Sequence, residues 1–398
     1  MSGFDKAGIR RLGDVMSGHV ERDDVGGVAW LAACADDVEV GWAGALSRGE
    51  PAPVQRDSIF RIASMTKPIT AVGALILVEE CRLRLDDPVD DLLPELADRR
   101  VLVDGRGPID GETVPANRPI TLRDALTFRL GSGMDFTAPW PQPLLEKMAE
   151  LGLGSGPPEP QVPPDPDEWI RRVSTLPLLY QPGERWLYHV GSNVLGVLIA
   201  RAAGQPLHVF LRERVFEPLA MVDTAFSTEQ VDRLGTCYAM NPETGERMVY
   251  DPPDGQWAKP PAFPSGGGGL VSTLDDLHRF GRMLLDGGRL PDGTRLLSRP
   301  SVEAMTTDHL GDSRSVSGPS PDGSQGWGFG VSVQVRRTDL GPSVGGYGWA
   351  GGLGSSWAND PRERIVGIVL TTDMFTSAYP PPATIRDFWT GTYGAIDD

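Results

Sequence analysis

The sequence predicts an α/β (α+β) fold with a central antiparallel sheet flanked by helices. Strand-like segments lie near both ends of the chain, at residues 26–46 and 326–372, and helix-like segments occupy the middle. We therefore expect residues 1–85 and 265–398 to form one sheet domain. Residues 86–264 would then form an inserted subdomain that is mostly helical or irregular.

The first part of the chain begins with an amphipathic pattern at residues 4–22, which predicts a helix. Residues 26–46 then read as two strands joined by a turn at residues 35–37. Residues 98–118 are polar and predict a loop or a small hairpin.

The middle of the chain contains three further helix patterns, at residues 120–128, 192–203 and 206–217. Between the first two lies a segment rich in proline and glycine, residues 138–168. It predicts a long irregular surface segment, which is either a lid over a site or a plain surface loop.

The last part of the chain combines one helix with several strands. Residues 232–262 predict a meander, and Thr273 caps a helix at residues 274–285. Residues 326–335 alternate as a single antiparallel strand should, and weaker strand patterns follow at residues 343–349, 354–358 and 364–372.

The composition excludes several classes of protein. With 398 residues and a net charge of −17, the chain is not expected to bind nucleic acid or an anionic membrane surface. The sequence has neither 18 consecutive apolar residues nor a signal-type start, so we expect no membrane span and a cytoplasmic location. Three distant cysteines predict buried thiols in a reducing compartment: Cys34, Cys81 and Cys237. The five histidines form no metal-ligand spacing, and we expect neither a metal nor a cofactor.

Residues 58–80 contain the best candidate for chemistry. A short apolar strand ends here and a helix begins near Met65, so Ser64 lies at the helix start with Lys67 one turn later. A buried lysine loses its proton more easily and suits the role of a base for a serine nucleophile. An N-cap serine followed by a surface lysine would give the same pattern.

Two other motifs match by letter only. Residues 346–351 fit GxGxxG, with Asp373 further on, but no helix pattern follows them. Residues 341–345 fit GxSxG around Ser343, but no histidine follows His309 to complete a hydrolase triad. We expect neither a dinucleotide site nor a nucleophile elbow.

Three stretches, in order and spacing, resemble the serine β-lactamase and penicillin-binding-protein superfamily, and most closely its family VIII carboxylesterases. The first is Ser64-Met-Thr-Lys67, which is similar to the family's Ser-x-x-Lys. The second is residues 182–193 around Tyr188, and the third is Trp349-Ala-Gly351 in the place of the Lys-Thr-Gly strand.

The resemblance implies a role for each matching residue. Ser64 would be the nucleophile that forms an acyl-enzyme, and Lys67 and Tyr188 would handle its proton. Tyr188 would be the base once the lysine cation acidifies its phenol. The backbone N–H groups of Ser64 and Gly352 would form the oxyanion hole, with Gly351 and Trp349 beside the substrate.

The sequence departs from the family at two motifs. Val190 stands where many penicillin-recognising members have Asn, and Trp349 replaces the cationic Lys. Phe128 likewise replaces a common His. The resemblance therefore implies a small, fairly apolar ester as substrate. The sequence leaves the acyl pocket open, with Phe136, Trp140, Trp257 and Trp327 as candidates for its lining. Acyl transfer, amide or β-lactam hydrolysis, and a non-catalytic penicillin-binding-like sensor remain alternatives on the same site. The sequence leaves the oligomeric state open.

Overall fold

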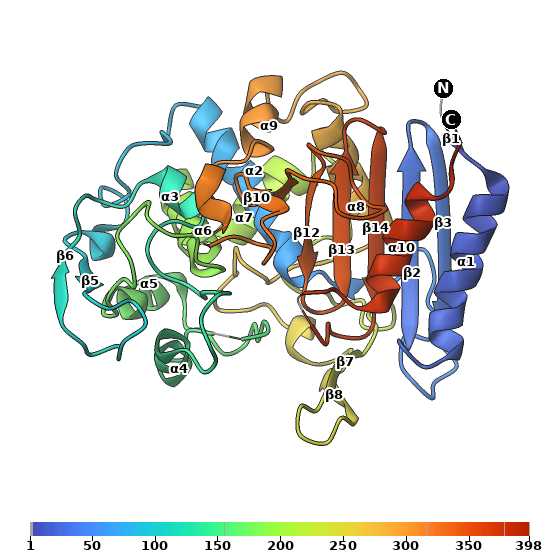
Figure 1. Ribbon diagram of the computed structural model, residues 1–398, viewed down its shortest axis with the longest axis horizontal. Helices are drawn as coiled ribbons and strands as arrows, with labels where there is room; N and C mark the ends of the chain where they lie inside the picture. Colours follow the sequence, from blue (N-terminus) through green and yellow to red (C-terminus); the bar gives the residue numbers. More distant parts are fainter. Residues whose placement is uncertain (1–2, 155, 316, 378, 398) are drawn as a thin grey trace.

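A seven-stranded antiparallel sheet joins the two ends of the chain in the computed structural model, which describes residues 3–154, 156–315, 317–377 and 379–397 (Figure 1). The strand order is β10-β11-β12-β13-β14-β2-β3. β2 (Gly27–Cys34) pairs with β3 (Asp37–Gly44) on one side and with β14 (Ile365–Thr371) on the other. The predicted α/β class, with a sheet built from both chain ends, is confirmed.

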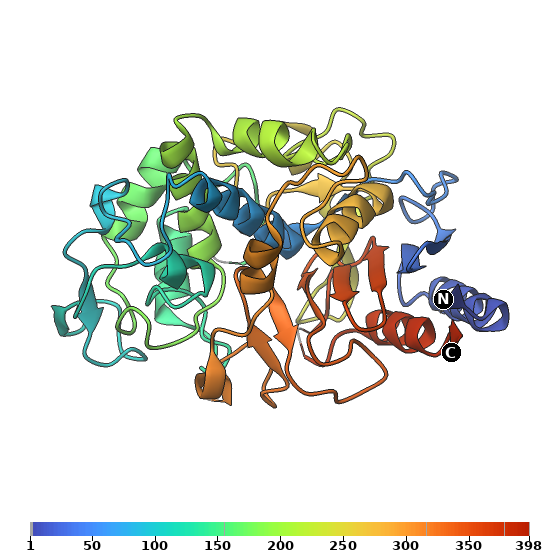
Figure 2. The same ribbon diagram turned by 90° about the horizontal axis from the view of Figure 1, so that it is seen from above.

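Both faces of the sheet are covered, as Figure 2 shows from above. Alternate residues of β2 point to opposite faces. Val28, Trp30 and Ala32 pack with α1 (Lys6–Glu21) and α10 (Ala383–Tyr393). Ala29, Leu31 and Ala33 belong instead to the large core shared with α2 and α8. Burial on both faces explains why β2 is apolar along its whole length.

Several helix starts follow from capping residues in the sequence. The Asp5 carboxylate accepts the N–H groups of Ala7 and Gly8 at the start of α1. Thr273 caps α8 (Leu274–Leu285), as predicted. Thr121 and Asp124 form a reciprocal capping box on α3 (Leu122–Leu126).

The helical region lies beside the sheet and contains most of residues 66–217 (Figure 1). Its main helices and the small hairpin are α2 (Thr66–Glu79), α4 (Pro143–Glu150), α5 (Pro166–Ser174), α6 (Val190–Ala203), α7 (Leu207–Leu211), β5 (Arg100–Leu102) and β6 (Thr113–Pro115). One hydrophobic core runs from this region into the sheet. The division at residues 86–264 therefore stays a prediction.

The remaining elements complete the sheet side and its edges: β1 (Gly3–Phe4), β4 (Phe60–Arg61), β7 (Cys237–Met240), β8 (Arg247–Asp251), β9 (Val271–Ser272), α9 (Arg299–Met305), β10 (Gln325–Trp327), β11 (Ser332–Gln334), β12 (Tyr347–Gly351), β13 (Ser355–Asp360) and β15 (Ile396–Asp397). β1 pairs with β15, so the first and last strands lie together at the edge of the molecule.

The prediction of one strand at residues 326–335 is wrong. β10 and β11 are two short strands of a hairpin, with Gly326 opposite Val333. Gly330 turns the chain with a positive φ of 73°, and Gly328 packs against the Met305 carbonyl, where a Cβ would lie 2.0 Å from its oxygen. The alternation of side chains could not reveal this turn.

The structure also corrects smaller expectations. Residues 138–168 contain α4 and the start of α5, whose apolar residues Leu145 and Trp169 are buried, so this segment is not irregular throughout. Cys34 and Cys237 are buried as expected, whereas Cys81 is exposed. Within the described residues no single helix is long and apolar enough to cross a bilayer; only the bent pair formed by α6 and residues 207–216 passes that test together.

Candidate active site

Ser64 lies in a 3₁₀ turn, Ala63–Met65, that leads directly into α2. The residue before it, Ala63, has a left-handed backbone with a φ of 43°, which is costly for a residue with a side chain. Upstream, the buried Arg61 guanidinium is paired with the Asp251 carboxylate, Nε to Oδ2 2.7 Å, and stacks on Trp257. This buried ion pair fixes the strand that delivers Ser64.

Lys67 is fully buried, and its amine contacts Ser64. Its Nζ lies 2.9 Å from Ser64 Oγ and 3.2 Å from His189 Nδ1, and it donates to the Gly267 carbonyl. Burial lowers the pKa of Lys67 well below its usual value, because the charged form loses its hydration. The structure therefore favours the neutral amine, which can accept a proton.

Tyr188 faces Lys67 from the segment before α6. Lys67 Nζ lies 4.5 Å from the centre of the Tyr188 ring, and the Trp349 indole N–H donates to the Tyr188 hydroxyl at 2.8 Å. Burial raises the pKa of Tyr188 to about 12, although hydrogen bonds with Ser64 and Trp349 act in the opposite direction. The expected acidified phenol is therefore wrong in direction: Tyr188 keeps its proton at neutral pH.

Gly351 and Gly352, two of the residues predicted beside the oxyanion hole, lie at the end of β12. Gly351 packs against the Ile62 carbonyl, where a Cβ would lie 2.3 Å from the oxygen, so only glycine allows β12 this close to the Ser64 turn. Gly352 is exposed and has open space around it. In the described parts of the chain, neither the Ser64 N–H nor the Gly352 N–H has a hydrogen-bond partner. Both amides are thus available to an incoming oxygen atom.

Aromatic rings form the wall beside Tyr188. Its ring is 5.6 Å from the Trp349 ring and 5.1 Å from that of Phe136, centre to centre. Trp327 packs edge-on against Trp349 at 4.7 Å. Two of the four candidate pocket residues, Phe136 and Trp327, therefore lie here, together with Trp186 and Phe128, which the prediction of a pocket had not included.

The other two candidates lie elsewhere. Trp257 is buried beneath Arg61 and donates to the Gly269 carbonyl, and Trp140 is 65% exposed with no aromatic neighbour among the described residues. Trp349 also has a role that the sequence did not suggest, because its indole N–H binds the Tyr188 hydroxyl.

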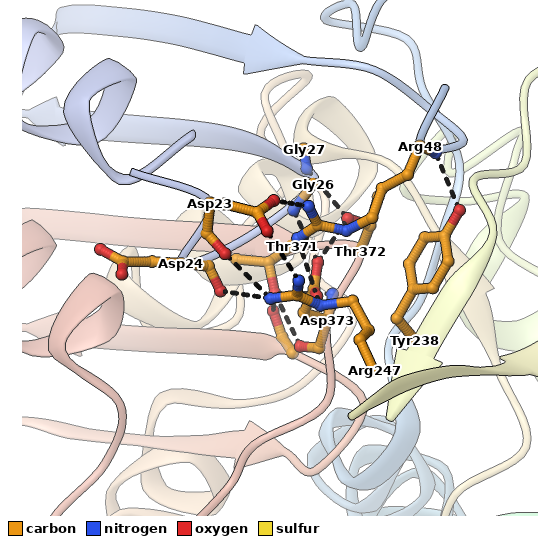
Figure 3. A network of polar contacts seen from close by, with 11 residues as sticks. Asp23, Asp24, Gly26, Gly27, Arg48, Tyr238, Arg247, Thr371, Thr372 and Asp373 are labelled. Carbon is orange, nitrogen blue, oxygen red and sulfur yellow. Dashed lines mark hydrogen bonds and ion pairs between the residues drawn. The ribbon is translucent and has the colours of Figure 1, made fainter. Parts of the chain in front are cut away.

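A polar network surrounds Asp373, which follows β14, as Figure 3 shows. The Asp373 carboxylate binds the Arg247 guanidinium at 2.7 Å and the Arg48 guanidinium at 3.2 Å, and it accepts the Gly26 N–H at 2.7 Å. Two residues later, the Phe375 N–H donates to the Gly352 carbonyl. The network thus anchors the chain that holds Gly352 in place.

Neither letter match is a site. Residues 347–351 are strand β12 and run into β13 without a helix, and Asp373 is engaged in the arginine network. Ser343 is buried, its N–H bound to the Asp360 carboxylate. Among the described residues, no group of three His, Cys, Asp or Glu side chains could hold a metal ion.

His189 and Asn193 were not predicted as site residues. His189 touches Lys67, and Asn193 contacts both His189 and the Gly267 backbone. The only signal in the sequence was their position beside Tyr188, because buried contacts across the chain cannot be read from one sequence.

The family model for beta-lactamase matches residues 12–388. The chain belongs to the beta-lactamase family. Esterase EstB of Burkholderia gladioli is 31% identical over 92% of this chain and 90% of its own length. Lovastatin esterase of Penicillium rubens (strain ATCC 28089 / DSM 1075 / NRRL 1951 / Wisconsin 54-1255) is 30% identical over 81% of this chain and 82% of its own.

The fold is shared with a solved structure, EstCE1, described as a hydrolase with promiscuous acyltransferase activity. It matches with a TM-score of 0.79 at 23% identity, covering 98% of this chain and 99% of its own. The expected serine β-lactamase and penicillin-binding-protein-like superfamily, with esterase relatives, is thereby confirmed. Family membership supports a serine hydrolase or acyltransferase activity for this chain.

Proposed function

We propose that the protein is a serine carboxylesterase of the family VIII type, which hydrolyses small, fairly apolar esters through an acyl-enzyme on Ser64. The observation that carries the proposal is the 2.9 Å contact between Ser64 Oγ and the buried Lys67 amine. The esterases among the relatives support the reaction class. We retain the cytoplasm as the proposed location, on the basis of the three distant cysteines.

In acylation, the neutral Lys67 amine takes the Ser64 proton while Oγ attacks the ester carbonyl. The N–H groups of Ser64 and Gly352 donate to the oxygen that becomes negative. Tyr188 Oη accepts from Trp349, so its own proton is free for the departing alkoxide, and Lys67 returns the proton to the phenolate. Water then attacks the acyl carbonyl through the same groups in reverse.

The site favours a neutral substrate. Trp349 occupies the position of the family's cation. Its ring packs against Tyr188, which in turn packs against the exposed ring of Phe136. An apolar acyl or alcohol group gains free energy by leaving water against these rings, whereas a carboxylate would find no cation in their place. We therefore expect weak activity on β-lactams.

The test is intact-mass spectrometry with a serine-reactive phosphonate, beside turnover of p-nitrophenyl acetate and butyrate. Wild type should gain one adduct on Ser64 and turn over both esters. Ser64→Ala should lose both signals, and the matched control Ser343→Ala should keep them. Full activity in Ser64→Ala would contradict the proposal, and an adduct without turnover would favour the sensor.

Acyl transfer remains a second candidate because the Phe136 edge of the aromatic wall is open to solvent, with Phe136 39% exposed. An alcohol that packs on this wall could intercept the acyl-enzyme before water does. Product analysis with added alcohols measures the ratio of transesterification to hydrolysis and thus separates the two functions.

A further inference from the structure

His189 contacts the site, but the proposed mechanism gives it no role. Its φ is +83° and its ψ −57°, and the Val190 N–H closes a three-residue turn onto the Tyr188 carbonyl at 3.2 Å. This turn is rare and strained for a residue with a side chain. At this turn the His189 ring lies between Lys67 and Asn193, with Nδ1 3.2 Å from Lys67 Nζ and Nε2 3.3 Å from Asn193 Nδ2.

The orientation of the Asn193 amide follows from its other contacts. Its Oδ1 accepts the Gly267 backbone N–H at 3.1 Å and the Ser265 hydroxyl at 2.8 Å. A backbone N–H can only donate, so the oxygen of Asn193 must face Gly267. The NH₂ group of Asn193 therefore faces His189.

This orientation fixes the proton on His189. The Asn193 NH₂ group can only donate, so Nε2 must accept, and the neutral ring then carries its hydrogen on Nδ1. That hydrogen points at Lys67 Nζ. An ammonium group has no lone pair to receive it, whereas a neutral amine has one.

The other groups around Lys67 also favour its neutral form. Its Nζ also faces the Ser64 hydroxyl, the Gly267 carbonyl and the Tyr188 ring, and no carboxylate is among its contacts in the described chain. Burial lowers the pKa of His189 well below its usual value, so the ring stays neutral. Tyr188 and His189 are thus the titratable side chains that face the amine.

We propose that His189 is a positioning residue that keeps Lys67 in the neutral amine form by presenting its Nδ1–H group to Nζ. The inference rests on the proposed function of Lys67 as the base for Ser64. Rotation about the Cε–Nζ bond turns the lone pair from His189 to Ser64 Oγ for the proton transfer. Afterwards the Nδ1–H group faces a cation and favours passage of the proton to Tyr188.

The test compares His189→Asn with His189→Asp. The two side chains have the same shape, both tolerate a positive φ, and their terminal atoms replace Nδ1. Asn can present an N–H to Lys67, whereas Asp presents a carboxylate that stabilises the ammonium. The measurement is the rate of Ser64 phosphonylation against pH, which reports the base without the later hydrolysis step.

The acid limb of each profile is the pH range in which the rate of phosphonylation rises as the base loses its proton. We expect the acid limb of His189→Asn to stay within about half a pH unit of that of the wild type. In His189→Asp it should move up by about two units, because a carboxylate close to an amine favours its charged form. Thermal unfolding confirms that each variant folds, and His189→Gly, which relieves the strained turn, measures the loss of the ring alone. Its acid limb should move up by about one unit.

Coinciding acid limbs in the wild type and all folded variants would overturn the proposal and leave His189 with a packing role. An upward shift in His189→Asn equal to that in His189→Asp would overturn it as well. Failure of the proposed function looks different, because Ser64 of the wild type would then remain unlabelled at every pH.

Discussion

Two ionisable side chains face Ser64, and the same physical cause acts on them with opposite results. Lys67 lies on the polar side, among a hydroxyl, an imidazole and a carbonyl, and burial lowers its pKa. Tyr188 lies on the aromatic side, and burial raises its pKa to about 12. Loss of hydration favours the neutral form of each, an amine and a phenol.

Under the proposed function, Lys67 and Tyr188 have different roles, whereas the sequence predicted a general base pair. A neutral amine is a proton acceptor and a neutral phenol is a proton donor, so the two sides supply a base and an acid at one pH. Substitutions that remove either Lys67 or the Tyr188 hydroxyl test these two roles separately.

The largest effect should come from Lys67→Met, which keeps the length of the side chain but removes the base. We expect kcat/KM for p-nitrophenyl butyrate to fall by about 10³-fold or more, because nothing else near Ser64 can accept its proton. Steady-state kinetics measure this. A loss below about tenfold would mean that Tyr188 is the base after all.

Lys67→Met also tests whether Lys67 is neutral in the folded protein. In the unfolded chain Lys67 stays protonated up to its ordinary pKa, whereas in the folded protein the amine is already neutral at lower pH. Between these two pKa values the unfolded state binds one more proton. The free energy of unfolding of the wild type therefore rises with pH in this range. Lys67→Met should lack this contribution in urea unfolding at pH 7 to 9. Equal slopes would show that Lys67 is charged in the folded protein.

A smaller effect is expected from Tyr188→Phe, which keeps the ring and removes the proton donor. For ethyl butyrate, whose alkoxide needs a proton to leave, we expect a loss of about 10²-fold in kcat/KM. For p-nitrophenyl butyrate, whose leaving group is stable as an anion, the loss should be smaller. Equal losses on both esters would argue against a donor role.

The smallest effect should come from Trp349→Phe, which removes the indole N–H from the Tyr188 hydroxyl. We expect a loss of about tenfold in kcat/KM, the size of one hydrogen bond. Trp327→Phe is the matched control, because the Trp327 N–H binds the Leu126 carbonyl and not Tyr188. If both variants lost the same activity, the effect would be one of packing.

The sequence predicted the features that depend on local pattern. The helix at α3, the capped start of α8, the β2–β3 hairpin and the Ser64–Lys67 turn follow from residues close together in the chain. It missed the hairpin within residues 325–334, where glycines turn a chain that still alternates.

The properties of the site that the sequence did not predict depend on contacts between residues far apart in the chain. The direction of the Tyr188 pKa and the contacts of His189 depend on burial by segments far away in sequence. Trp349 could be aligned with the family's Lys position, yet its bond to Tyr188 spans 161 residues. A hydrophobic pattern indicates that a residue is buried, but it does not indicate which residues surround it in the folded protein.

The β12 edge, the Gly267 carbonyl and the Tyr188 segment reach Ser64 from parts of the chain that synthesis completes at very different times. Contacts of such long sequence separation close late in folding, since each must first overcome the entropy of a large loop. A partly folded chain therefore holds Ser64 and Lys67 without the Tyr188 hydroxyl and without the Gly352 N–H. Esterase activity should accordingly return during refolding only when the complete tertiary structure has formed. The rate of its return would then equal the rate of the last folding step.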